Sequence, residues 1–238
     1  MAKKRISRKE LLDQSDEFIT QTQRVFNFVS EHPKKIILGA SIVLAVVIAI
    51  FGIKFYFDYN ARQALAAYDQ AMLKVSKLKN LDSKSNGEEV EAALDALERV
   101  STMYSRTAPG RQALFDLGTL YFHLKQYNQA IFTYKKGLNA LKPEEEALRP
   151  FILDSLAYAY EAQDKLNEAA ARWEEIIQLP GELLKEQAFF SLGRIYAAMN
   201  QPEKSRNAYQ QLVDRFPNSP NLNLARFKLK KTAQGKSE

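Results

Sequence analysis

Two patterns of hydrophobic residues follow one another along the chain. Every residue from Ile36 to Ile53 is uncharged, and a helix over this run would be about 27 Å long, close to the roughly 30 Å hydrocarbon core of a bilayer. After residue 58, apolar residues recur three or four positions apart with polar residues between them, which is the period of an amphipathic helix. The pattern therefore predicts an all-α chain, with one transmembrane helix at 36–57 and a stack of helices after it.

A buried core helix or a cleaved signal peptide could also give the apolar run. The apolar stretch of a signal peptide begins soon after a basic start, whereas this run begins at position 36. The nearest Ala-x-Ala site, Ala64 to Ala66, lies beyond the charged residues Asp58 and Arg62. We therefore expect the segment to be retained as a membrane anchor.

The tail before the span, residues 1–35, contains eight Lys and Arg side chains. Basic residues in a short tail favour its retention in the cytoplasm, which predicts that the rest of the chain lies across the membrane. Ser7 and Glu10 form a capping-box pattern before apolar residues at helical spacing, which predicts an amphipathic helix in the tail. Such a helix would lie on the membrane, pack against a partner, or remain solvated without a specific function.

Three copies of one pattern follow the span. In each copy a small residue is followed by an aromatic residue at +3, a second small residue at +12 and a second aromatic residue at +16, and the copies are shifted by 39 and then 36 positions. Small residues let paired helices approach closely, and the aromatic residues fill the space between pairs. These structural positions are Gly118, Tyr121, Ala130 and Tyr134; Ala157, Tyr160, Ala169 and Trp173; and Gly193, Tyr196, Ser205 and Tyr209.

The composition argues against an enzyme. The chain has no cysteine and two histidines, His32 and His123, which are far apart in the sequence, so thiolate sites and a His-x-x-x-His zinc pair are excluded. Its nine glycines are too widely spaced for a phosphate-binding loop. We expect no catalytic activity, no cofactor, no metal and no small-molecule substrate. The net charge of +6 comes from the two ends of the chain, so it supports a membrane topology more than nucleic-acid binding.

The repeated residues resemble the tetratricopeptide repeat over roughly residues 110 to 218, although the period is longer than the usual 34. The resemblance implies antiparallel helix pairs that stack into a solenoid, whose first helices line a concave peptide-binding groove. Aromatic residues in such a groove would bind apolar side chains of an extended polypeptide, although several could instead pack between helices. The carboxylate-clamp residues of some relatives are missing, since Phe115, Thr119 and Ser155 occupy those places. The implied groove positions are Gln112, Phe115, Thr119, Phe122 and His123; Phe151, Asp154, Tyr158 and Glu161; and Gln187, Phe190 and Arg194.

The order of the parts resembles the YfgM-like bacterial inner-membrane proteins. The predicted parts are a cytoplasmic tail (1–35), the span (36–57), a helical pair (58–108), three repeats (109–218) and a capping helix with a basic tail (219–238). This resemblance implies a single-pass adaptor with a periplasmic repeat domain, close to the Sec translocon. Its partners would be the translocon, exported polypeptides or periplasmic folding factors, together with membrane lipid. A scaffold of another envelope complex, for cell division or outer-membrane assembly, is the alternative.

Overall fold

The computed structural model describes residues 23, 26, 28, 30, 33–78 and 87–234, with side chains as far as Lys231. The predicted tail helix lies outside the described residues except at four isolated positions, and residues 79–86 and 235–238 also lie outside them. The chain divides into two units, Met1–Tyr59 and Asn60–Glu238. The all-α prediction is confirmed, since the described residues form helices and turns with no strand.

The apolar run lies in α2, Pro33–Ser76. None of its most apolar 18-residue window is buried, and the helix is long and apolar enough to cross a membrane. A core helix would be mostly buried, so this exposure argues against that alternative. The α2 helix continues through residues 57 and 58, where the sequence pattern separates the span from the first solenoid helix. Within the second unit, Ala64 and Ala71 of α2 are fully buried.

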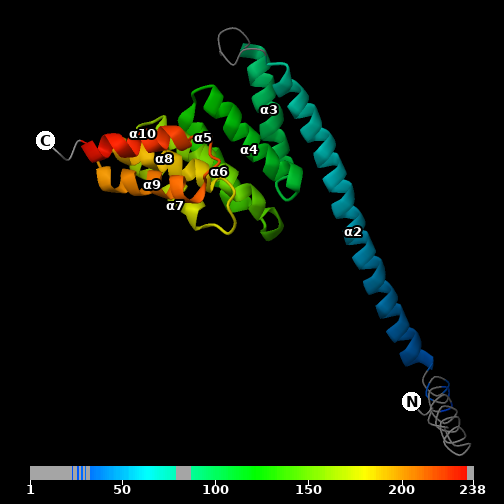
Figure 1. Cartoon of the computed structure of the whole chain (residues 1–238). Helices are drawn as coiled ribbons and strands as arrows, with labels where there is room; N and C mark the ends of the chain where they lie inside the picture. The colour runs from blue at the N-terminus through cyan, green and yellow to red at the C-terminus, as the bar shows by residue number, and fades with distance from the viewer. Residues whose placement is uncertain are drawn as a thin grey trace, which may run out of the picture. The chain divides into compact units, whose positions relative to one another are not determined.

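The second unit is a stack of antiparallel helices, which Figure 1 shows side by side from α3 to α10. Each helix from α3 onward packs against the next one along the chain, as expected for a solenoid in which every repeat contacts its neighbours. The elements are α3 Gly87–Met103, α4 Ala108–His123, α5 Tyr127–Ala140, the 3₁₀ helix η1 Pro143–Leu148, α6 Arg149–Glu161, α7 Leu166–Gln178, α8 Lys185–Ala198, α9 Pro202–Arg215 and α10 Leu222–Gln234.

Within each pair, the small residue of the first helix lies against the aromatic ring of the second. A Cβ added to Gly118 would lie 2.6 Å from Cε1 of Tyr134, so the ring occupies the space that a side chain would need. Gly193 and Tyr209 have the same relation, also at 2.6 Å. All the predicted structural positions are buried except Tyr121, which is half-buried. Helix pairing thus follows from the small and large residues that the repeat places opposite one another.

The turn inside each pair has the same geometry in all three repeats. Lys125, Asp164 and Asn200 adopt left-handed backbone conformations, with φ of 60°, 58° and 54°. The residue after each one donates its N–H to the carbonyl of the +3 tyrosine, for example Gln126 N to Tyr121 O at 2.9 Å. This is the Schellman ending of a helix, which satisfies carbonyls at its C-terminus. It reverses the chain within a few residues and makes the two helices antiparallel.

The stack ends in α10, whose buried Ala225 lies in a cluster with Phe189, Tyr209 and Leu212. The other end is closed by α2, where Ala71 joins a cluster that contains Leu97 of α3. Between them, the largest core cluster connects α5 through α9 and includes the fully buried Trp173.

Candidate polypeptide-binding groove

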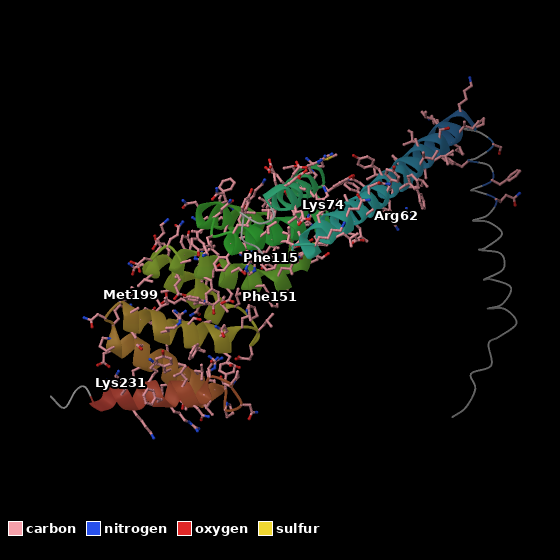
Figure 2. All side chains as sticks on the ribbon, turned by 90° about the horizontal axis from the view of Figure 1, so that it is seen from above. Arg62, Lys74, Phe115, Phe151, Met199 and Lys231 are labelled. Atoms are coloured by element: carbon pink, nitrogen blue, oxygen red, sulfur yellow. The ribbon has the colours of Figure 1, made fainter. Side chains whose placement is uncertain are left out.

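The predicted groove residues lie on the first helices of the three pairs, α4, α6 and α8. Equivalent places in successive repeats hold Phe115, Asp154 and Phe190, each three residues before the small residue of its helix. Phe115 and Phe151 are labelled in Figure 2. Whether this surface binds a polypeptide stays a prediction. The contacts of each residue show which ring faces and polar groups are present for such binding.

Four of the five groove aromatics are half-buried and rest on other rings. The ring centroids of Phe115 and Tyr134 are 6.1 Å apart, and those of Tyr158 and Trp173, which meet edge to face, are 5.3 Å apart. The ring centroids of Phe190 and Tyr209 are 6.1 Å apart, and those of Phe122 and Tyr127 are 5.6 Å apart. Phe151 differs, with 39% of its surface exposed. The first four therefore contribute to packing as well as to the surface, whereas Phe151 presents the most accessible ring.

Polar groove residues connect α6 to α8. Gln187 Nε2 donates a hydrogen bond to Tyr158 Oη at 2.5 Å. Arg194 forms a bidentate ion pair with Glu161, in which Nη2 lies 2.7 Å from Oε2. This pairing raises the pKa of the Arg194 guanidinium. The same side chains that were predicted to bind a ligand thus also hold neighbouring repeats in register.

The remaining predicted positions of the first repeat have separate environments. Thr119 Oγ1 accepts a hydrogen bond from Tyr134 Oη at 3.2 Å, and His123 is exposed at the end of α4. Gln112 is 3.4 Å from Asp116, which also accepts a 2.7 Å hydrogen bond from Tyr68 of α2. Burial raises the pKa of the Asp116 carboxyl. The sequence reasoning missed this junction because nothing in the repeat pattern pairs Tyr68 with Asp116.

Asp154 stands at the middle of the predicted groove and is only partly exposed. The Trp173 indole donates its Nε1–H to Asp154 Oδ1 at 2.8 Å. Burial raises the pKa of this carboxyl, and the hydrogen bond from Trp173 opposes the shift. Asp154 takes part in none of the ion pairs among the described residues. The carboxylate is therefore desolvated without a compensating cation.

Replacing Asp154 with asparagine should stabilise the solenoid at neutral pH. Because folding raises the carboxyl pKa above its ordinary value of 3.8, the ionised form costs stability once the pH exceeds that value. An amide removes this cost and still accepts the hydrogen bond from Trp173. We expect the melting temperature to rise by about 2–4 °C at pH 7, the shift that about 1 kcal/mol gives a domain of this size. Circular dichroism would measure it.

The gain should disappear near pH 3, where the wild-type carboxyl is protonated in both the folded and the unfolded chain. Asp154→Ala is the matched variant, because it also removes the acceptor of the indole hydrogen bond and should lose stability. A lower melting temperature for Asp154→Asn at pH 7 would contradict this account of the carboxylate.

The second helices present a different exposed ring, Phe132 of α5, at 71% exposure. It borders a surface hollow of about 300 Å³ between α3, α4 and α5, together with Leu114, Leu117 and Tyr121. The repeat register contains a signal for it, since the equivalent places in the other copies hold Ala171 and Asn207. The ring is not among the residues that the three copies share, so the repeat pattern alone does not predict it.

The arrangement supplies ring surfaces, hydrogen-bonding groups and one carboxylate that is in no ion pair among the described residues. Among the described residues, no group of three or more His, Asp or Glu side chains could hold a metal ion. The fold defines a helical-repeat protein of the tetratricopeptide class, whose members act as protein-interaction scaffolds. The profile of the tetratricopeptide repeat-like domain family matches residues 27–234, and the chain belongs to that family.

Solved structures share the fold at low sequence identity. The crystal structure of MamA is 20% identical, with a TM-score of 0.52, and the match covers 65% of this chain and 82% of that one. A tetratricopeptide repeat protein from Parabacteroides merdae is 14% identical, with a TM-score of 0.56 and coverage of 71% and 61%. No curated protein matches the sequence.

Proposed function

We propose that the chain is a single-pass adaptor of the bacterial inner membrane, with its solenoid in the periplasm, where it binds polypeptides near the Sec translocon and assists their export or folding. The observation that most supports this is the combination, in one chain, of an unburied apolar helix and a repeat domain with an accessible groove aromatic. Neither part alone requires the other, but their combination supports a binding domain that is tethered to a bilayer.

The anchor has two supporting observations. Its apolar side chains from Ile37 to Phe57 are exposed along α2, which costs free energy in water and none in lipid. The family match begins at residue 27, so the family's shared region includes this segment as well as the repeats. The basic tail before the segment supports a cytoplasmic N-terminus.

The binding role follows from the family and from the groove. Tetratricopeptide repeat-like domains are protein-interaction modules, and the predicted groove offers Phe151, Tyr158 and Asp154 on one helix. Rings bind apolar side chains, which newly exported chains expose before they fold. The location beside the translocon rests on the likeness to YfgM-like proteins.

A photoreactive amino acid placed at Phe151 tests the proposal in living cells. Irradiation should link the chain to translocon subunits or to unfolded secretory polypeptides. The matched control is the same photoreactive residue at Phe132, an exposed ring on a second helix, which should give few of these products. Recovery of cell-division or outer-membrane assembly proteins alone would replace the translocon role with the envelope-scaffold alternative.

Protease added to spheroplasts tests the topology in the same strain. The solenoid should be digested while an epitope on the N-terminal tail remains protected. A protected solenoid with an accessible tail would place the repeats in the cytoplasm and contradict the proposal.

A further inference from the structure

We propose that Asp154 forms an anionic subsite in the groove, which binds the lysine or arginine side chain of an extended polypeptide whose apolar residues contact the neighbouring rings. This inference rests on the proposed polypeptide-binding function and specifies which polypeptides the groove prefers.

The first argument is the position of Asp154 within the repeat. The equivalent places in the first and third repeats hold Phe115 and Phe190, so a carboxylate replaces a ring only in the middle repeat. Successive first helices line the same face of a solenoid, and the carboxylate therefore lies between two aromatic positions of the groove. The middle repeat also has Trp173 in place of the tyrosine of the other two copies, and its indole N–H donates to the Asp154 carboxylate.

The second argument is the hydrogen bonding of the carboxylate. Trp173 Nε1 fixes Oδ1 at 2.8 Å, which orients the group, while Oδ2 has no hydrogen-bond donor among the described residues. Asp154 is partly exposed, so Oδ2 is not sealed inside the core. A fixed carboxylate with one oxygen available is suited to accept a charge-assisted hydrogen bond from a cation.

The third argument is charge. The negative charge of Glu161 is compensated by Arg194, which donates two hydrogen bonds to it, and both residues are predicted groove positions. Asp154 is in no ion pair among the described residues. The Asp, Glu, Lys and Arg side chains at the groove positions sum to one negative formal charge, and that charge is on Asp154. A cationic side chain complements it, whereas an acidic one is repelled.

The geometry also separates this carboxylate from Asp116, the other half-buried aspartate of the first helices. Asp116 accepts hydrogen bonds from Tyr68 and Gln112, so its role is to join α2 to α4. Asp154 has only the indole donor and remains able to accept another.

Calorimetric titration of the full chain in nanodiscs tests the subsite. The probes are a short extended peptide with leucine and phenylalanine on both sides of one central lysine, and the same peptide with glutamine in place of lysine. We expect the lysine peptide to bind roughly tenfold more tightly, the effect of one charge-assisted hydrogen bond in a partly desolvated site. Asp154→Asn should bind both peptides equally, at the affinity of the glutamine peptide.

Glu168→Gln is the matched control, because it removes one exposed acidic side chain from α7 and should leave the preference for lysine intact. If the wild-type chain binds both peptides equally well, the subsite is refuted while the polypeptide-binding proposal stands. If it binds neither peptide, both proposals fail. If Asp154→Asn weakens both peptides by the same factor, Asp154 supports the groove structurally and the subsite is again refuted.

Discussion

Replacing Gly110 with alanine should reduce the free energy of unfolding by about 3 kcal/mol or more, the largest loss we expect from adding a single methyl group. A Cβ on Gly110 would lie 2.0 Å from the carbonyl oxygen of Tyr104 and 2.5 Å from its carbonyl carbon. That carbonyl is held by two donors of Thr107, the backbone N–H at 2.8 Å and Oγ1–H at 2.7 Å. Thr107 also caps α4 by accepting the Gly110 N–H, so the clash cannot be relieved without disrupting the start of the helix.

Gly137→Ala provides the matched control, because Gly137 is also a buried helical glycine. Its added Cβ would lie 3.8 Å from Leu114 Cβ and 3.9 Å from Ile152 Cδ1, which is ordinary van der Waals contact. We expect this variant to gain about 0.5–1 kcal/mol from the higher helix propensity of alanine. Denaturant titrations of both variants measure the contrast, and similar values for the two would refute the backbone clash at Gly110.

Replacing Arg111 with methionine should cost about 2–3 kcal/mol, the loss expected when the charge-assisted hydrogen bonds of a partly buried ion pair are removed. The guanidinium contacts both oxygens of the Glu145 carboxylate at 2.5 Å, and the two side chains are only 5% and 11% exposed. The pair joins α4 to η1. Without Arg111, the partly buried carboxylate loses its main stabilising partner.

The pH dependence follows from the direction of the Glu145 shift. Hydrogen bonding to Arg111 lowers the pKa of this carboxyl below its ordinary value of 4.5. The stability that the pair contributes is therefore present above pH 4.5 and is lost as the pH falls through the lower, folded-state pKa. The difference in unfolding free energy between wild type and Arg111→Met should shrink below about pH 4.

The double variant Arg111→Met with Glu145→Leu separates charge from packing. Replacing both ions by apolar residues of similar size is often neutral or stabilising, so we expect most of the loss to be recovered. A double-mutant cycle of unfolding free energies gives the coupling. If the double variant is as unstable as Arg111→Met alone, the loss comes from the packing of the arginine stem and not from the orphaned carboxylate.

The helical stack could be predicted from the sequence because its main contacts repeat. The small residue at Gly118 and the ring at Tyr134 are sixteen positions apart in every copy, and that regularity identifies both helices and the face on which they meet. The turns were partly predictable, since Asp164 and Asn200 are residue types that tolerate a left-handed backbone. Lys125 adopts the same conformation without any such signal.

Contacts that occur once could not be predicted in this way. Gly110 is needed because the start of α4 passes close to the backbone of Tyr104. The periodicity of side chains along the sequence does not indicate such a backbone contact. The ion pair of Arg111 with Glu145 joins residues 34 apart that belong to different elements. Within the groove, the rings of Phe115 and Phe190 rest on Tyr134 and Tyr209 of the second helices. Phe151 lies at an earlier position of its repeat and is 39% exposed, a difference that the sequence pattern alone does not predict.

The hydrogen bond between Trp173 and Asp154 has a practical consequence, because Trp173 is the only tryptophan in the chain. Its indole is fully buried, yet its Nε1–H contacts a carboxylate at the middle of the predicted groove. The emission of an indole responds to the charge and polarity next to it, so neutralisation of Asp154 by a bound cation should alter the intrinsic fluorescence of the protein. The chain thus contains its own unlabelled optical probe of groove occupancy.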